Sequence, residues 1–119
     1  MDRGEFYNLK KTIQNEGMAP IRIVSDSMEP LLDVNRNYQV ASMNREPKRF
    51  DIIVFYREQK LFAHYVWRAN TLGGKSFTTR SLKDPKNDEV PVPEEDILGI
   101  LVGKRLNFIK KLILSLKYA

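Results

Sequence analysis

The segment from residue 51 to residue 68 constrains the fold of this chain more than any other part of the sequence. Residues 51–57 read DIIVFYR, a run that is apolar on both faces and too short for a typical helix. Glu58 and Gln59 form a tight turn, and residues 61–68, which follow Lys60, are a second run rich in aromatic and branched side chains. Two such runs joined by a tight turn predict an antiparallel β-hairpin whose first strand is buried.

The flanking sequence predicts a mainly β domain with a short helix at each end. Apolar residues share one face in residues 5–16, where Gly17 would cap the helix, and again in Phe108–Tyr118. Between the helices we expect a β-prone run at 21–24, strands at 37–43, Ser76–Arg80 and 97–103, a turn at 72–75 and a charged loop at 81–96. The predicted organisation is a helix and lead-in at 1–19, a β domain at 20–104 and a basic helix at 105–119.

The residue inventory excludes several kinds of chemistry. The 119 residues include no cysteine and one histidine, His64. Disulfides, iron–sulfur clusters, thiolate zinc sites and cysteine nucleophiles are therefore excluded, as are metal sites built from several histidines. We expect no cofactor and no metal.

The net charge of +5 comes from the C-terminal segment. Residues 103–119 hold five of the 20 basic residues and none of the 15 acidic ones, so the remainder of the chain is neutral. Basic charge suggests nucleic acid or an anionic lipid surface as a partner, but no nucleic-acid motif supports the first. For the amphipathic segment Phe108–Tyr118 we expect the apolar face to pack on the β domain. The alternative is weak, salt-sensitive membrane contact.

No part of the sequence predicts a membrane span or a signal peptide. The N-terminus is polar and lacks an apolar core. The longest apolar-leaning stretch, Phe108–Tyr118, contains three lysines and is shorter than the roughly 20 residues that cross a bilayer. We therefore expect a soluble protein, with the cytoplasm as its location.

Five short motifs follow one another in residues 21–104. They are SMEPLL at 27–32, RFDIIVF at 49–55, AHYV at 63–66, FTTRS at 77–81 and ILGILVGK at 97–104. In this order and spacing they resemble the conserved segments of type I signal peptidases and the related LexA-type peptidases. The resemblance implies a LexA/signal-peptidase-like β fold and a hydrolase of the serine protease class that processes proteins.

The resemblance also implies roles for individual residues. Ser27, directly before Met28, corresponds to the nucleophile, and His64 to the general base on the facing strand. Members of the family use lysine or histidine as this base, so His64 places the chain on the histidine branch. The Ser27 amide and the Ser25 hydroxyl would form the oxyanion hole. Met28 would line the substrate cleft, and Pro30 would fix the turn that presents Ser27.

The carboxylate that supports the histidine is less well defined by the sequence. Matching 79–81 to the family's Thr-Lys-Gly places Leu82 where the first aspartate belongs, and leucine cannot orient an imidazole. Asp88, six positions later, corresponds to the second aspartate of the histidine branch. Asp84 is the alternative acid if the loop is shifted.

Structural interpretations exist for each of these residues taken alone. The serine segment could be an ordinary turn, His64 could be a packed residue among aromatics, and Asp84 and Asp88 could be solvated loop carboxylates. The joint occurrence of the motifs favours catalysis. A second Ser-Met pair, Ser42-Met43, lacks the proline and lies in a predicted strand.

The function that we expect from the sequence is a signal-peptidase-like serine endopeptidase. Only 26 residues precede Ser27, which leaves no room for a membrane anchor or a DNA-binding domain, and the chain has no Ala-Gly or Cys-Gly bond for LexA-type self-cleavage. We therefore expect it to cleave a separate peptide or protein after a small residue. The alternative, favoured by Leu82, is an eroded member of the fold that binds a peptide or partner.

Overall fold

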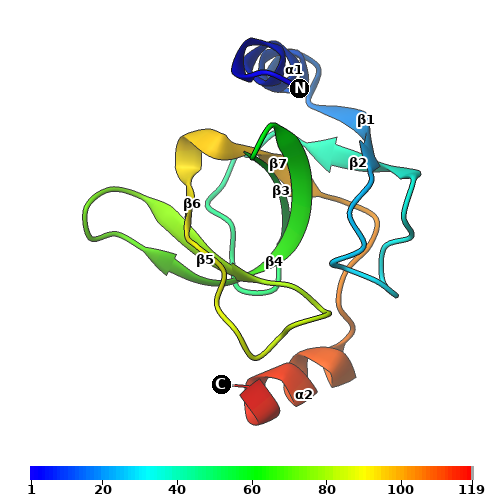
Figure 1. Ribbon diagram of the computed structural model, residues 1–119, viewed down its shortest axis with the longest axis vertical. Coiled ribbons are helices and arrows are strands. Elements are labelled where there is room, and N and C mark those ends of the chain that lie inside the picture. Colours follow the sequence, from blue (N-terminus) through cyan, green and yellow to red (C-terminus); the bar gives the residue numbers. More distant parts are fainter. Residues whose placement is uncertain (119) are drawn as a thin grey trace.

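The computed structural model describes residues 1–118 and has one seven-stranded antiparallel sheet with a helix near each terminus (Figure 1). The strand order is β1-β2-β7-β3-β4-β5-β6. The elements are α1 (Arg3–Glu16), β1 (Met18–Ile23), β2 (Arg36–Ala41), β3 (Ile52–Arg57), β4 (Lys60–Asn70), β5 (Ser76–Arg80), β6 (Val92–Pro93), a 3₁₀ turn (Glu94–Asp96), β7 (Ile97–Leu101) and α2 (Phe108–Tyr118). The predicted mainly β fold with two terminal helices is confirmed.

The hairpin of β3 and β4 forms as the sequence predicts. Ile53 pairs with His64 across it. Glu58 and Gln59 have φ angles of 53° and 63°, the left-handed conformation that two-residue hairpin turns adopt. β3 is bonded to β4 on one side and to β7 on the other, so its first five residues are all buried. This central position explains the apolar run on both faces.

The two faces of the sheet bury separate apolar clusters. Along β3, Val54 and Tyr56 belong to the larger cluster, whereas Ile53 and Phe55 belong to the smaller, because successive side chains of a strand point to opposite faces. The larger cluster also receives Phe6 and Ile13 of α1 and Met28 and Leu32 of the loop between β1 and β2. Along β4, Ala63 and Tyr65 lie on the larger cluster's face, and His64 contacts Phe55 of the smaller cluster.

Helix α1 begins two residues before its predicted start because Asp2 caps it. The Asp2 carboxylate accepts a hydrogen bond from the Glu5 amide at 2.8 Å, and the Glu5 carboxylate accepts one from the Asp2 amide at 3.2 Å. This reciprocal pair satisfies backbone donors of the first turn. Gly17, with φ of 89°, ends the helix as predicted.

Strand boundaries differ from the prediction at several places. β1 begins at Met18 and includes Pro20, so it crosses the domain boundary predicted at residue 19. Proline is tolerated because β1 lies at the edge of the sheet and is bonded only to β2. β2 ends at Ala41, so Ser42 and Met43 lie beyond the strand. The charged loop at 81–96 contains the short strand β6 and the 3₁₀ turn.

Helix α2 has the predicted bounds, but its apolar face does not pack on the β domain. Leu114 is its one buried residue, while Ile109 and Leu116 are 68% and 78% exposed. The expectation that this face covers the sheet is wrong, because Leu114 occupies the opposite side of the helix. Within residues 1–118, no helix has the length and apolar character needed to cross a membrane.

Candidate active site

The loop between β1 and β2 presents Ser27 and is fixed by two buried side chains. Met28 and Leu32 are each 1% exposed in the larger cluster, and the Leu32 amide donates to the Met28 carbonyl at 3.0 Å. Met28 therefore anchors the loop in the larger cluster. The prediction from the sequence that Met28 lines a substrate cleft is wrong, because its side chain is buried. Pro30 is exposed, and it lines a shallow hollow together with Leu31 and Leu82.

The Ser27 hydroxyl has two neighbours. Its Oγ donates to the main-chain carbonyl of Ala63 at 3.2 Å and lies 2.9 Å from the Ser25 Oγ. The Ser25 Oγ also accepts a hydrogen bond from the Ser27 amide at 3.2 Å. The two groups predicted to form an oxyanion hole are thus adjacent, and in the free protein they are bonded to each other.

His64 is 8% exposed and lies on the face of β4 opposite to Ala63 and Tyr65. Its Nδ1 lies 3.3 Å from the Thr79 hydroxyl, and the Phe55 ring meets it edge-on with centroids 5.2 Å apart. Burial, with a further contribution from the positive charge of Arg57, lowers the pKa of His64 to about 4. The imidazole is therefore neutral at neutral pH, the form in which a ring nitrogen can accept a proton.

Ser27 and His64 lie at the same open edge of β4. On one side, residues 60–64 of β4 pair with β3, but β5 pairs with β4 only from Tyr65 onward. The Ser27 hydroxyl bonds to the carbonyl of Ala63 at this edge, one residue from His64. In the described part of the chain, no hydrogen bond joins the Ser27 hydroxyl to the His64 ring directly. The Ser27 hydroxyl thus contacts the main chain one residue before His64, and the His64 side chain points to the opposite face of β4 from the side chains of Ala63 and Tyr65.

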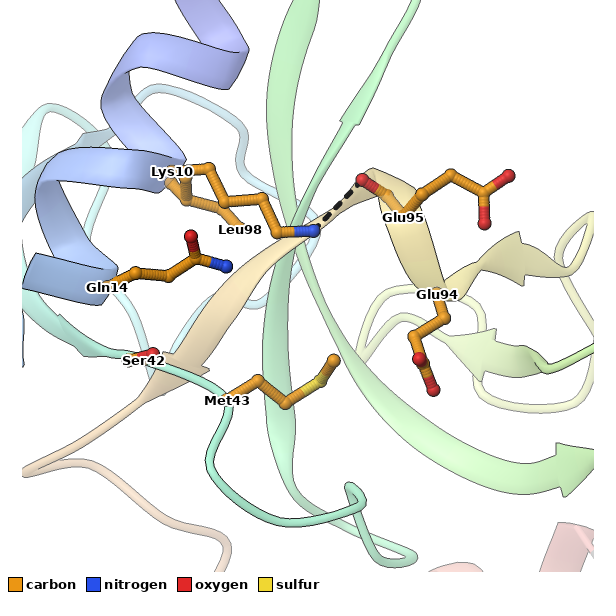
Figure 2. Close-up of a pocket in the computed structure, with 7 residues that line it drawn as sticks. All are labelled: Lys10, Gln14, Ser42, Met43, Glu94, Glu95 and Leu98. Atoms are coloured by element: carbon orange, nitrogen blue, oxygen red, sulfur yellow. Dashed lines mark hydrogen bonds between the residues drawn. The ribbon is translucent and has the colours of Figure 1, made fainter.

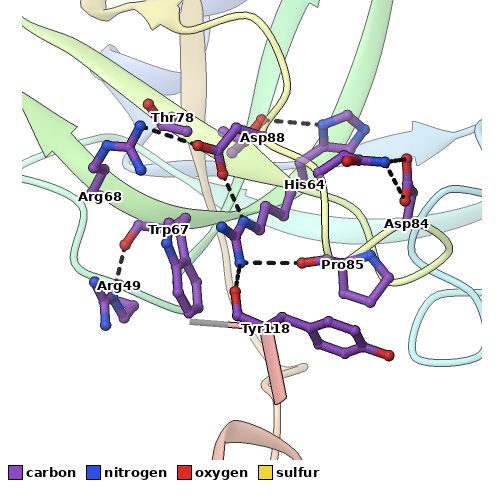
Figure 3. A network of polar contacts seen from close by, with 12 residues as sticks. Arg49, His64, Trp67, Arg68, Thr78, Asp84, Pro85, Asp88 and Tyr118 are labelled. Carbon is purple, nitrogen blue, oxygen red and sulfur yellow. Dashed lines mark hydrogen bonds and ion pairs between the residues drawn. The ribbon is translucent and has the colours of Figure 1, made fainter. Parts of the chain in front are cut away.

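The structure does not bring Asp88 to His64. Asp88 accepts hydrogen bonds from Arg80 Nε at 2.7 Å and from Arg68 at 3.1 Å (Figure 3). The bond from Arg80, with a smaller contribution from Arg68, holds the pKa of Asp88 below its usual value. Arg80 is itself fixed, because it lies 4.0 Å over the Trp67 ring and donates to the Tyr118 carbonyl at 2.6 Å.

The alternative acid, Asp84, forms its hydrogen bonds within its own loop and not with His64. Its carboxylate accepts from the Asn87 side-chain amide at 2.9 and 3.0 Å, and its amide donates to the Ser81 hydroxyl at 3.0 Å. Leu82 packs against the larger cluster. The side chain that contacts the His64 ring in place of an aspartate is that of Thr79, which the sequence analysis did not predict. The strand register was the available signal, since Thr79 pairs with Val66 and points to the same face as His64.

Other hollows in the described residues lie away from Ser27. One lies beside His64, has a volume of about 270 Å³ and is lined by apolar and charged residues: Phe55, Arg57, Glu58, Phe62, His64, Glu89 and Val90. Another lies between α1 and the 3₁₀ turn, where Lys10 Nζ donates to the Glu95 carbonyl at 3.1 Å (Figure 2). Ser42 and Met43 line this second hollow, to which no residue of the Ser27 loop contributes. Residues 1–118 contain no cluster of potential metal-ligating side chains.

Burial of His64 predicts a specific dependence of stability on pH. The folded pKa of about 4 lies below the ordinary value of 6.5, so the unfolded chain binds a proton first as pH falls. The contribution is complete above pH 6.5 and is lost between pH 6.5 and pH 4, by about 3 kcal/mol in total. Urea denaturation of the wild type across this range should show that loss. His64→Phe should show little of this loss. If the free energy of unfolding falls equally steeply with decreasing pH in both proteins, His64 is not buried in its neutral form.

No protein-family model matches this chain, and no curated protein matches its sequence.

Proposed function

We propose that the protein is a serine endopeptidase of the signal-peptidase-like type, with Ser27 as nucleophile and His64 as general base. The observation that carries the proposal is the hydrogen bond from the Ser27 hydroxyl to the carbonyl of Ala63. This bond attaches the hydroxyl to the main chain one residue before His64, the chain's only histidine, at a part of β4 that β5 does not pair with. A serine hydroxyl needs such a neighbouring base to become nucleophilic.

The arrangement supports a defined sequence of proton transfers. When His64 Nδ1 carries the proton, it donates to Thr79, and Nε2 is left with a lone pair that can accept the Ser27 proton. The Ser27 oxygen then bonds to the scissile carbon to give a tetrahedral intermediate, and its former proton passes from His64 to the amine as the carbon–nitrogen bond breaks and the acyl-enzyme forms. Water hydrolyses the resulting acyl-enzyme by the same transfers in reverse. Substrate binding must exchange the Ser27–Ala63 bond for one to His64, a tightening that free enzymes often require.

The open edge of β4 suits an extended peptide substrate. Residues 60–64 have no strand partner on the side away from β3, and a peptide added there as a strand would run past the serine that bonds to the Ala63 carbonyl. The amide of Ser27 and the hydroxyl of Ser25 lie at the same place and can stabilise the oxyanion once they release each other. We expect a small residue, such as alanine, before the cleaved bond, and a separate peptide or protein as the substrate.

Cleavage of peptides that contain Ala-x-Ala tests the proposal. The wild type should produce new N-termini, measured by mass spectrometry, and His64→Ala should be slower by roughly a thousandfold or more. Since the pKa of His64 is about 4, the acid limb of kcat/KM should lie near pH 4 and not near pH 6.5. Equal turnover by the wild type and His64→Ala would refute the assignment.

Asp88→Asn is the matched control for the supporting group. Because Asp88 is engaged by Arg80 and Arg68, its removal should change kcat/KM by less than about tenfold, compared with about ten-thousandfold for an aspartate that orients a catalytic histidine. A loss of the larger size would assign the supporting role to Asp88 in place of Thr79.

A second candidate is a peptide-binding module with an eroded catalytic site. Two observations favour it: Leu82 stands where the resemblance predicts an aspartate, and Asp88 is neutralised by two arginines. Under this alternative, wild type and Ser27→Ala bind the same peptides with equal affinity and neither cleaves them.

A further inference from the structure

The solvent-facing side of α2 is an aliphatic stripe. Ile109, Leu112, Ile113 and Leu116 follow the spacing i, i+3, i+4, i+7 that aligns residues on one helix face. They are 68%, 47%, 46% and 78% exposed, whereas Leu114, on the opposite side, is 1% exposed. The helix thus turns its apolar face away from the protein, the reverse of what burial in a core requires.

Contacts near both ends of α2 fix this orientation. At the start, the Asn107 side chain accepts a hydrogen bond from the Lys110 amide at 2.7 Å. At the end, Arg80 Nη1 donates to the Tyr118 carbonyl at 2.6 Å, and Leu114 inserts into the larger cluster between them. Figure 1 shows α2 at the margin of the molecule, at the opposite end from α1. The aliphatic stripe therefore stays exposed without any change in the fold.

The charge around the stripe indicates what covers it. Residues 103–119 carry five basic side chains and no acidic one. Within residues 1–118, arginines and lysines elsewhere form nine ion pairs with acidic side chains. No ion pair in this part of the chain involves the five basic residues of the C-terminal segment: Lys104, Arg105, Lys110, Lys111 and Lys117. A second copy of this face would bring like charges together, whereas an anionic surface would neutralise them.

We propose that α2 docks the protein on anionic lipid membranes, lying parallel to the surface with its aliphatic stripe in the acyl boundary. Aliphatic side chains bordered by lysines are the combination that holds a helix in this interface. Since the rest of the chain is electrically neutral, attraction to anionic headgroups acts through this segment and orients it toward the lipid. The proposal stands apart from the peptidase function and is tested without any cleavage assay.

Vesicle flotation of the full chain tests the docking. The protein should float with vesicles of phosphatidylcholine mixed with phosphatidylglycerol, and much less with phosphatidylcholine alone. In about 1 M salt, where the Debye length falls to about 3 Å, binding to the anionic vesicles should fall sharply. Absence of flotation with anionic vesicles at low salt would overturn the proposal.

Variants separate the aliphatic from the electrostatic contribution. Leu116→Asp should lower the partition coefficient by roughly tenfold or more, and Lys110→Gln with Lys117→Gln by roughly fivefold for each lysine. Leu72→Asp is the matched control, since Leu72 is 97% exposed in the turn between β4 and β5; it should bind like the wild type. Circular dichroism verifies that each variant is folded.

Two results would overturn the proposal, and the second would identify another binding partner for the stripe. If Leu116→Asp floats as well as the wild type, the stripe does not contact lipid and the proposal fails. If sedimentation shows a dimer that Leu116→Asp dissociates, and the wild type does not bind anionic vesicles, the stripe belongs to a second copy.

Discussion

Replacing Ser27 by alanine is expected to reduce peptide cleavage by at least about a thousandfold. Its hydroxyl bonds to the Ala63 carbonyl of β4, one residue before His64, and under the proposed mechanism the substitution deletes the atom that forms the acyl-enzyme. Loss of a catalytic serine costs up to about a millionfold in kcat in well-studied serine peptidases, and the residual rate comes from substrate binding and the oxyanion hole. Initial rates on an Ala-x-Ala peptide, measured for both proteins at equal concentration, give the ratio.

Ser25→Ala is the matched control for this prediction. The two serine hydroxyls lie 2.9 Å apart in the same loop, so both variants remove a similar hydrogen bond from similar surroundings. If Ser25 only donates to the oxyanion, its loss should cost roughly a hundredfold to a thousandfold in kcat and should leave acyl-enzyme formation intact. If Ser25→Ala, and not Ser27→Ala, abolishes the acyl-enzyme detected by mass spectrometry, the nucleophile is Ser25.

The stability of Ser27→Ala separates a catalytic loss from an unfolded protein. The half-buried hydroxyl bonds to the Ala63 carbonyl and to the Ser25 hydroxyl, and hydrogen bonds of this kind contribute about 1 kcal/mol each. The variant should therefore keep the wild-type circular dichroism spectrum and melt only a few degrees lower. Cleavage that is lost without a comparable loss of folding places the effect in the chemistry.

Elements that are determined by local sequence were predictable. The apolar run at 51–57 and the Glu58-Gln59 turn give the β3–β4 hairpin because residue spacing alone fixes strand, turn and register. Both helices follow from periodicity. The start of α1 was misplaced because a capping box depends on side-chain hydrogen bonds of Asp2 and Glu5 that periodicity does not report.

Which way a helix face points could not be read from its periodicity. The pattern of α2 predicts an apolar face correctly, but the same pattern suits a core or a lipid surface. The structure turns the stripe outward because Leu114 and the Arg80–Tyr118 bond attach the other side. These are contacts between residues far apart in the sequence, which a local pattern does not contain.

The candidate site was predictable in its strands but not in its hydrogen bonds. In the structure the Ser27 loop contacts the main chain of β4 at Ala63, one residue before His64. The choice of Asp88 as supporting acid rested on the resemblance to the second aspartate of the histidine branch, which does not take the competing contact with Arg80 into account. A buried arginine needs a partner for its charge, and Asp88 supplies it at 2.7 Å. Thr79, one residue from Arg80 and on the opposite face, is left to contact His64.

Strand β3 connects β4 to β7 in the sheet. β7 lies between β2 and β3, and β3 carries β4. Val54 of β3 pairs with Gly99 of β7, next to a shift in register between Val54 and Phe55. β3 therefore pairs on one side with the strand that contains Gly99 and on the other with the strand that contains His64.

Gly99→Ala is the substitution with the largest expected effect on stability. An added Cβ would lie 2.2 Å from the Ala41 carbonyl oxygen and 2.8 Å from the Val40 Cγ1. The first contact is with backbone, which cannot move aside without breaking the pairing of β2 with β7. We expect a loss of about 3 kcal/mol or more in the free energy of unfolding, and a melting temperature lower by roughly 12 °C or more, measured by urea and thermal denaturation.

Gly73→Ala distinguishes this steric effect from the general cost of replacing a glycine. Gly73 lies in an exposed turn with φ of 77°, and a Cβ there would meet nothing within 4 Å. Its replacement should cost only the roughly 1–2 kcal/mol of placing an alanine in a left-handed conformation. Because Gly99 has no positive φ, a loss at Gly99 that exceeds the loss at Gly73 measures the close approach of β2 to β7. Equal losses would mean that β2 can withdraw from β7 and that this contact does not hold the sheet.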